Sequence, residues 1–165
     1  MGSTDYACDD DGIAFITINN PSRKNAMTYQ MIEQMYRHLT VAGNEARVVI
    51  LTGAEDAFCA GIDLNFLSGI PPEERGIKVP THDESGLWNI TACPVPVIAA
   101  VNGPAVGMGA EWTSHCDIRI VSTNARFAWN FAHRGLIPDT GAGTWLLPRQ
   151  IGIQNALKLL YSGEW

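Results

Sequence analysis

The sequence is short of positive charge and has no long hydrophobic run. It carries 11 Lys and Arg against 17 Asp and Glu, a formal net charge of −6. Because a nucleic-acid backbone is bound by a basic face, this balance argues against a nucleic-acid partner. Prolines, asparagines and charged residues interrupt each apolar run well before membrane-spanning length. We therefore expect neither a nucleic-acid partner nor a membrane span.

Two further absences concern cellular location and metals. The N-terminus lacks a basic segment followed by an apolar stretch, so no secretory signal is visible. The four cysteines, at positions 8, 59, 93 and 116, form no pair at metal-ligand spacing, and we expect no metal site. The last three lie among apolar or small residues, which favours buried, reduced thiols in a cytoplasmic protein.

What the sequence does contain is enough apolar material for one domain. Of its 165 residues, 46% are hydrophobic and only 17% are charged. That composition is typical of a globular protein with a sizeable core. No internal repeat, low-complexity tract or composition shift marks a boundary, so residues 1–165 are read as one domain.

Strand-like and helix-like segments alternate along the chain. Strands are expected at 13–19, 47–53, 95–101 and 118–122, with helices from Thr28 to about 43 and at 82–92, 107–115, 143–150 and 153–162. Residues 69–81 have the composition of a surface loop. Alternating strands and helices imply right-handed crossovers, so the prediction is an α/β fold with a largely parallel sheet.

The stretch 95–117 organises the chain. Seven apolar residues form a buried strand, Asn-Gly-Pro breaks it, and Gly107 and Gly109 lead into a helix with Glu111 near its start. Such a turn points backbone N–H groups into a cleft, where they can hold an anion or a developing oxyanion. An ordinary strand–helix connection with small packing residues explains the same pattern. A second turn of this kind covers residues 57–64.

These segments, taken in order, resemble the crotonase (enoyl-CoA hydratase/isomerase) superfamily. The likeness covers nearly the whole chain, and the ordered set is specific although each piece alone is weak. It is carried by Asn20-Pro21 with Lys24-Asn25-Ala26, 48–53, 58–64, 96–103, 107–111, Cys116-Asp117, Phe127, 135–138, and 147–149 with Gly152.

The resemblance implies a crotonase-like ββα spiral with flanking helices, and a homotrimer or hexamer. It implies an acyl-CoA thioester as substrate, with coenzyme A part of the substrate and no separate cofactor. The N–H groups of Ile62 and Met108 would bind the thioester oxygen. The substrate and coenzyme A channel would be lined by Lys24, Ala26, Ala60, Gly61, Ile62, Asp63 and Leu64.

The available acids favour an isomerase over a hydratase. Hydratases of the superfamily use two glutamates; the first matches Glu111, but the second falls on Phe131, which cannot activate water. Asp139 resembles the aspartate with which some family isomerases move a proton along the acyl chain. One extra residue lies between Pro138 and Gly143 relative to the common pattern. An isomerase needs one base and a held enolate, so a double-bond shift is the favoured reaction.

Other interpretations remain open at this stage. Glu111 alone could support hydration, and His133 could serve a carbon–carbon hydrolase of the same superfamily acting on diketones. An inactive structural homologue is the fourth possibility. Structural roles also exist for each residue: Glu111 as a helix-start acid, Asp139 as a turn former, and His133 as a half-exposed residue bonded to backbone.

The chain stops soon after an apolar helical segment, whereas superfamily members usually continue with further C-terminal helices. We expect a chain truncated before those helices. The helix at 153–161 would then be partly uncovered, which favours self-association.

Overall fold

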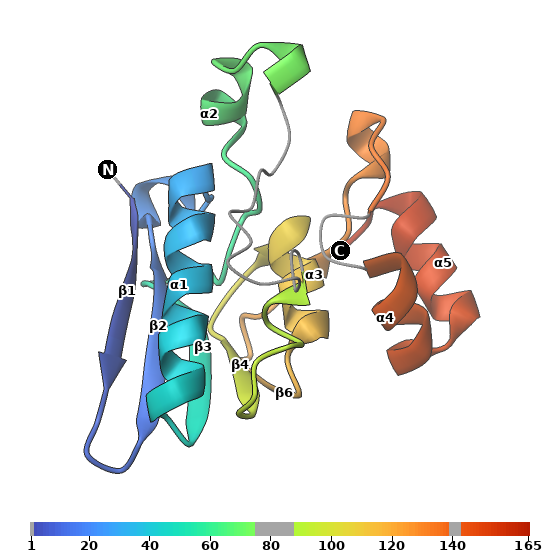
Figure 1. Cartoon of the computed structure of the whole chain (residues 1–165). Helices are drawn as coiled ribbons and strands as arrows, with labels where there is room; N and C mark the ends of the chain where they lie inside the picture. Colours follow the sequence, from blue (N-terminus) through green and yellow to red (C-terminus); the bar gives the residue numbers. More distant parts are fainter. Residues whose placement is uncertain (1, 75–87, 139–142) are drawn as a thin grey trace.

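A five-stranded sheet forms the larger layer of the molecule (Figure 1). The computed structural model describes residues 2–74, 88–138 and 143–165. The sheet order is β1-β2-β3-β4-β6, with β1 antiparallel to β2 and the other neighbours parallel. The strands are β1 (Ser3–Cys8), β2 (Ile13–Asn19), β3 (Val48–Gly53), β4 (Val97–Val101) and β6 (Ile118–Val121). The predicted largely parallel sheet is confirmed.

One long helix, α1 (Tyr29–Glu45), packs against this sheet. Thr28 caps it as expected, because its Oγ1 accepts a hydrogen bond from the Met31 N–H at 3.3 Å. The helical spacing of Met31, Ile32, Met35 and Leu39 places all four side chains in the core. They meet inward-facing strand residues such as Leu51, which pairs in register with Ile16 and Ala99.

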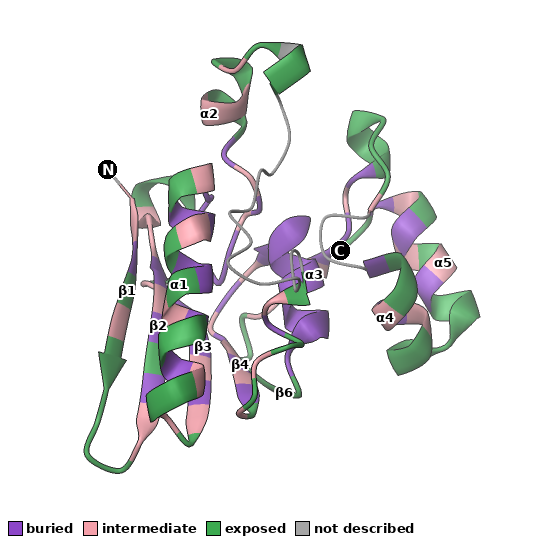
Figure 2. Cartoon of the chain, viewed as in Figure 1, coloured by how far each residue is buried: buried purple, intermediate pink, exposed green. Residues whose placement is uncertain are grey.

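A smaller layer lies beside the carboxyl ends of the strands. Strands β5 (Ala105–Val106) and β7 (Phe127–Ala128) pair in parallel, and Cys59 and Ile62 make single bridges to Ala105 and Met27. The helix α3 (Met108–His115) follows, and every one of its residues is buried (Figure 2). The short helix α2 (Leu64–Ser68) and three single 3₁₀ turns, at Pro21–Arg23, Pro72–Glu74 and Ala132–Arg134, complete this part.

The last two helices form a separate small cluster. The helices α4 (Gly143–Ile151) and α5 (Ile153–Ser162) pack on each other, and α4 contacts α3 (Figure 1). Their buried residues, including Leu147, Ala156 and Leu160, join Ala110 of α3 in a second core. Ile153 and Tyr161 of α5 are exposed.

The structure corrects some predicted elements. Of the helix expected at 82–92, residues 82–87 lie outside the described residues, and 88–92 form turns instead. Within this stretch the Ala92 N–H donates to the Trp88 carbonyl at 2.8 Å, so a single turn closes before Pro94. Strands β1, β5 and β7 were not predicted, whereas the helix start expected at the end of the turn at 57–64 is α2, which Asp63 caps. Among the described residues, no helix is long and apolar enough to cross a bilayer.

Two of the three cysteines predicted to be buried are so. Cys59 and Cys116 are buried, Cys93 is half-buried and Cys8 is exposed. Burial raises the pKa of the Cys59 and Cys116 thiols to about 12, so both are protonated at neutral pH.

Candidate active site

The turn at residues 59–63 is held on one side by the segment around Met27. The Ala60 N–H donates to the Lys24 carbonyl at 3.0 Å. The Met27 N–H donates to the Gly61 carbonyl at 2.8 Å, and the Asp63 N–H returns a bond to the Met27 carbonyl at 2.9 Å. Because the residues on either side of Ile62 bond to Met27, the N–H of Ile62 itself points the opposite way.

That opposite side is occupied by the start of α3. A Cβ added to Gly61 would stand 2.9 Å from the Val106 carbonyl oxygen and 3.6 Å from the Met108 nitrogen. Gly61 also has φ +88°, a backbone conformation that residues with a side chain rarely adopt. The glycine therefore allows the turn at Gly61 and Ile62 to approach the Met108 amide closely.

The Met108 N–H is the first of α3. Gly107, at φ +55°, precedes it and donates to the Ala128 carbonyl at 2.8 Å, which ties the helix start to β7. Helix starts leave their first amides without intrahelical acceptors. Within the part of the chain that the structure describes, the N–H groups of Ile62 and Met108 donate to no backbone or side-chain acceptor. Two neighbouring turns thus offer two available donors.

Glu111 lies one turn into α3 and is fully buried. Its N–H donates to the Gly107 carbonyl at 3.0 Å, in the same turn as Met108. Its carboxylate contacts Gly143, the first residue of α4. An acidic side chain thus lies inside the protein, held between two helices.

Phe131 is also close to the start of α3. It is 8% exposed, and its ring comes within 3.8 Å of the position that a Cβ on Gly107 would occupy. Its neighbours in the second core are apolar, among them Ala110 and Trp129. This side of the helix start is therefore lined by an aromatic ring.

His133 and Asp139, the other predicted catalytic residues, are not placed beside Glu111 by any described contact. His133 is exposed, and its Nε2 lies 3.1 Å from the Cβ position of Gly163, just after α5. Asp139 lies outside the described residues.

Two of the predicted channel residues, Lys24 and Asp63, form ion pairs. Lys24 pairs with Asp56 at 2.7 Å, and both side chains are exposed. Arg23 makes two bonds to Asp63, at 3.1 and 3.3 Å, and its hydrogen bonding holds the pKa of that carboxyl below its usual range. Asp63 also caps α2 by accepting the Asn65 and Phe66 N–H groups. Ala26 is buried and Leu64 is exposed.

Two asparagines that the sequence analysis gave no role fix the loop before the turn. Asn25 is fully buried and donates to the carbonyls of Ala54 and Ala57 at 2.8 and 2.7 Å. Asn102 donates to the same Ala57 oxygen at 3.2 Å. Asn25 has a left-handed backbone (φ +58°), a conformation that asparagine tolerates better than most residues. The spacing of residues in the sequence does not reveal this conformation.

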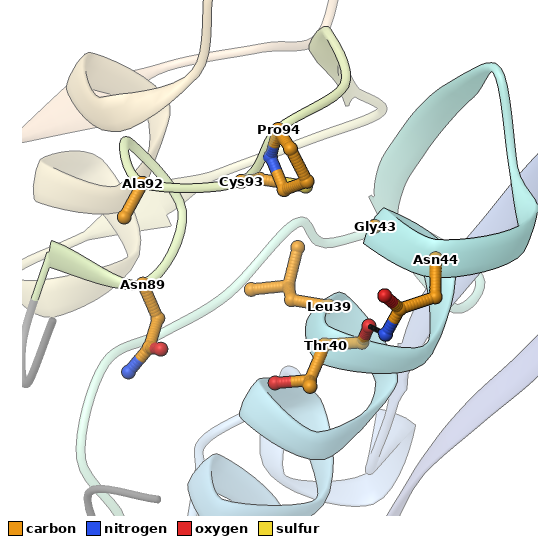
Figure 3. Close-up of a pocket in the computed structure, with 8 residues that line it drawn as sticks. All are labelled: Leu39, Thr40, Gly43, Asn44, Asn89, Ala92, Cys93 and Pro94. Carbon is orange, nitrogen blue, oxygen red and sulfur yellow. Dashed lines mark hydrogen bonds between the residues drawn. The ribbon is translucent and has the colours of Figure 1, made fainter. Parts of the chain in front are cut away.

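A pocket of about 160 Å³ lies elsewhere, between α1 and the segment before β4 (Figure 3). It is lined by none of the predicted site residues. The lining residues are Leu39, Thr40, Gly43, Asn44, Asn89, Ala92, Cys93 and Pro94. Among the residues described, no group of three or more His, Cys, Asp or Glu could hold a metal ion.

Comparison with known families shows to which family this chain belongs. Residues 9–165 match the family described as enoyl-CoA hydratase/isomerase. This chain belongs to the enoyl-CoA hydratase/isomerase family. As a member of that family it has the crotonase fold, which confirms the predicted fold class.

Similar proteins include hydratases and decarboxylases. A probable enoyl-CoA hydratase of Rhodobacter capsulatus is 38% identical, over 93% of this chain and 59% of its own length. Human ethylmalonyl-CoA decarboxylase is 35% identical, over 96% of this chain and 52% of its own length. The crystal structure of an enoyl-CoA hydratase from Bacillus anthracis superposes with a TM-score of 0.83 at 35% identity, covering 99% of this chain and 63% of that one. This chain thus spans between half and two thirds of the length of these relatives.

Proposed function

We propose that this chain acts on acyl-CoA thioesters through an enolate whose oxygen is bound by the N–H groups of Ile62 and Met108. One observation carries the proposal: both amides are without a protein acceptor in the described structure, and Gly61 brings the two turns together. An enolate oxygen is stabilised by fixed donors at about 2.7–3.1 Å. Removing a proton from the α-carbon becomes feasible only when such donors take up the charge.

The reaction we propose is an isomerase-type shift of a double bond. One base removes a proton from the acyl chain, and the same proton returns at another carbon while the amides hold the enolate. Glu111 is fully buried on the same helix as the Met108 amide, whereas Asp63, next to Ile62, is paired with Arg23; Asp139 is the second candidate. Phe131 supports this choice, because an aromatic ring beside the helix start cannot activate the water that hydration requires.

The remaining proposals concern binding and assembly. Lys24, Ala26 and the segment from Ala60 through Gly61, Ile62 and Asp63 to Leu64 would line the coenzyme A channel. The exposed Lys24 ammonium can exchange its partner Asp56 for a phosphate, since surface ion pairs are weak. We also propose a homotrimer or hexamer and a cytoplasmic location. Hydration through Glu111 and an inactive homologue are retained as outcomes of the test below.

Decarboxylation is a second candidate for a specific reason. Relatives from human and Xenopus laevis, at 35% and 34% identity, are named ethylmalonyl-CoA decarboxylase. Loss of CO₂ from a malonyl-type thioester leaves the bonding electron pair on the same enolate, and an acid then protonates the carbon. This chemistry needs no second carboxylate to activate water. An apolar neighbour such as Phe131 also disfavours the charged carboxylate that departs.

The decisive experiment follows proton exchange at the α-carbon of a thioester in D₂O by NMR. Wild-type protein is incubated with crotonyl-CoA, a 3-enoyl-CoA and an ethylmalonyl-CoA, and products are identified. We expect proton exchange and a double-bond shift with the wild-type protein. The rates of Glu111→Gln and Asp139→Asn are each compared with the rate of His133→Ala. If neither carboxylate variant loses at least tenfold in rate, equal to about 1.4 kcal/mol, both assignments are wrong.

The pattern of products separates the candidates. Conversion of the 3-enoyl-CoA supports the isomerase, and CO₂ release supports the decarboxylase. Hydrated crotonyl-CoA as the main product would contradict the reasoning from Phe131. Activity on a diketone that is lost in His133→Ala, with no retention of coenzyme A, would support the hydrolase. Absence of exchange with every thioester would leave the inactive homologue.

A further inference from the structure

Helix α4 packs against α3 at three positions along its length. At its far end the Gln150 side chain donates to the Ser114 carbonyl at 2.7 Å. In its middle, Leu147 is buried in the same cluster as Ala110. At its first residue, Gly143 is buried against Glu111. The docking of α4 therefore bears directly on the buried carboxylate.

The contact at Gly143 has no room for a side chain. A Cβ there would overlap the Glu111 carboxylate, with Cδ and Cγ of the same side chain each 3.0 Å away. The three nearest atoms all belong to Glu111. Gly135 and Gly152, by contrast, have nothing within 4 Å of their Cβ positions.

The backbone conformation at position 143 does not require a glycine. Gly143 is not among the residues with positive φ, whereas Gly135 and Gly152 are, at +64° and +80°. Alanine is also the better helix former. A larger residue at position 143 would therefore fit only if the Glu111 side chain moved.

We propose that Gly143 is a positioning residue for Glu111. By lacking a side chain it lets the first turn of α4 close on the carboxylate and restrict the directions in which its oxygens can point. The catalytic consequence rests on the proposed function, in which Glu111 exchanges a proton with the acyl chain. A misplacement of a catalytic group by about 1 Å can cost about 100-fold in rate. Gly143→Ala should accordingly lower kcat by about tenfold or more while KM changes less than about twofold.

The contact itself is tested by stability, without any assay of activity. Gly143→Ala is measured by thermal unfolding in the wild-type protein and in a Glu111→Ala background. We expect it to lower Tm by about 3 °C or more in the wild type. In Glu111→Ala, where the space is vacated, the same change should leave Tm unchanged or raise it. Equal losses in both backgrounds would overturn the proposal.

The positioning role is tested by rescue. Glu111→Asp shortens the side chain by one methylene and draws the carboxylate away from position 143. We expect Gly143→Ala to slow α-proton exchange less in the Glu111→Asp background than in the wild type. Arg149→Ala is the matched control on α4, because that guanidinium stacks on Trp145 and bonds to its carbonyl within the same helix.

The unfolding and activity measurements distinguish this inference from the proposed function. If wild-type protein shows no exchange, the proposed function fails, and the unfolding cycle still decides whether Gly143 holds Glu111. If exchange is normal in Gly143→Ala, the positioning role is overturned while the proposed function stands. A KM increase at constant kcat would also overturn the positioning role, since it would indicate lost substrate binding.

Discussion

The chain has two cores of very different depth. Among the residues that the structure describes, the core between the five-stranded sheet, α1 and α3 joins 22 buried hydrophobic residues, whereas the core of α3, α4 and α5 joins six. From Leu136 to the end, described residues such as Ile137, Ile153 and Tyr161 expose large apolar side chains to solvent. Figure 2 shows the contrast, with burial concentrated on one side of α4 and α5. Stability should therefore be unevenly distributed.

The candidate site lies where these two regions meet. The amides of Ile62 and Met108 are fixed by the larger core, through Met27, Ala128 and the sheet. Glu111 is held between that core and α4, which belongs to the thinner one. Donors and carboxylate thus depend on different regions, and substitutions in each should affect function differently.

The largest effect is expected for Leu51→Ala in β3. Leu51 is fully buried in the central part of the sheet, so truncation leaves a cavity that its rigid neighbours cannot fill. We expect a loss of about 4 kcal/mol in the free energy of unfolding, measured by urea titration. Phe15→Ala, on the exposed side of neighbouring β2, is the control and should cost far less. Similar losses for the two variants would contradict the depth assigned to the larger core.

The next effect is pH-dependent and tests the end of α3. His115 is buried, its Nδ1 lies 2.7 Å from the Thr91 hydroxyl, and burial lowers its pKa to about 4. Because the folded state prefers the neutral ring, stability is full above the unfolded pKa of about 6.5. It is lost as pH falls from there to 4, by an amount on the order of 3 kcal/mol.

The measurement compares unfolding of wild type and His115→Gln between pH 7.5 and 4. Glutamine cannot acquire a charge in this range, so the difference between the two proteins isolates His115 from the carboxylates that titrate with it. We expect the wild type to lose more stability than the variant. Parallel curves would show that His115 is accessible to solvent.

Leu147→Ala is the counterpart of Leu51→Ala in the thinner core. Leu147 is 3% exposed, but fewer buried neighbours surround it, and they can relax into the space. We expect a loss of about 2 kcal/mol. Hydrogen exchange should show faster opening in α4 and α5, with β2, β3 and β4 unchanged. Uniform acceleration across both regions would mean that the two cores unfold as one unit.

Sequence patterns predicted the larger region better than the smaller one. The strands at 13–19 and 47–53 and the buried face of α1 follow from apolar periodicity, which reflects burial against one partner. The strand at 118–122 was predicted from its apolar residues, although Ile118, Ile120 and Val121 are exposed in β6. Strand β1 was missed because its residues, Ser-Thr-Asp-Tyr-Ala-Cys, carry little apolar alternation. It forms because the turn at Asp9–Gly12 brings it beside β2.

The site was predicted only in part, for a physical reason. Backbone turns rich in glycine are visible locally, so Ile62, Met108 and Glu111 could be proposed from the sequence. The close approach of Gly61 to Met108 and of Gly143 to Glu111 depends on packing between segments far apart in the chain. The same holds for Asn25, in the loop after β2, and Asn102, directly after β4, which both donate to the carbonyl of Ala57.

The smallest effect on stability is expected at the surface of the larger region. Lys24 and Asp56 form an ion pair in which both side chains are well exposed, and water and salt screen such pairs. Lys24→Ala should leave Tm unchanged within error, as should the control Arg37→Ala, which removes the exposed pair with Glu33. If Lys24 lines the coenzyme A channel, only the first variant should weaken coenzyme A binding, by about threefold in Kd, measured by calorimetry. Equal weakening of coenzyme A binding in both variants would show that the change in net charge causes it. A drop in Tm for Lys24→Ala alone would show that the lysine supports the packing of the turn and does not contact the ligand.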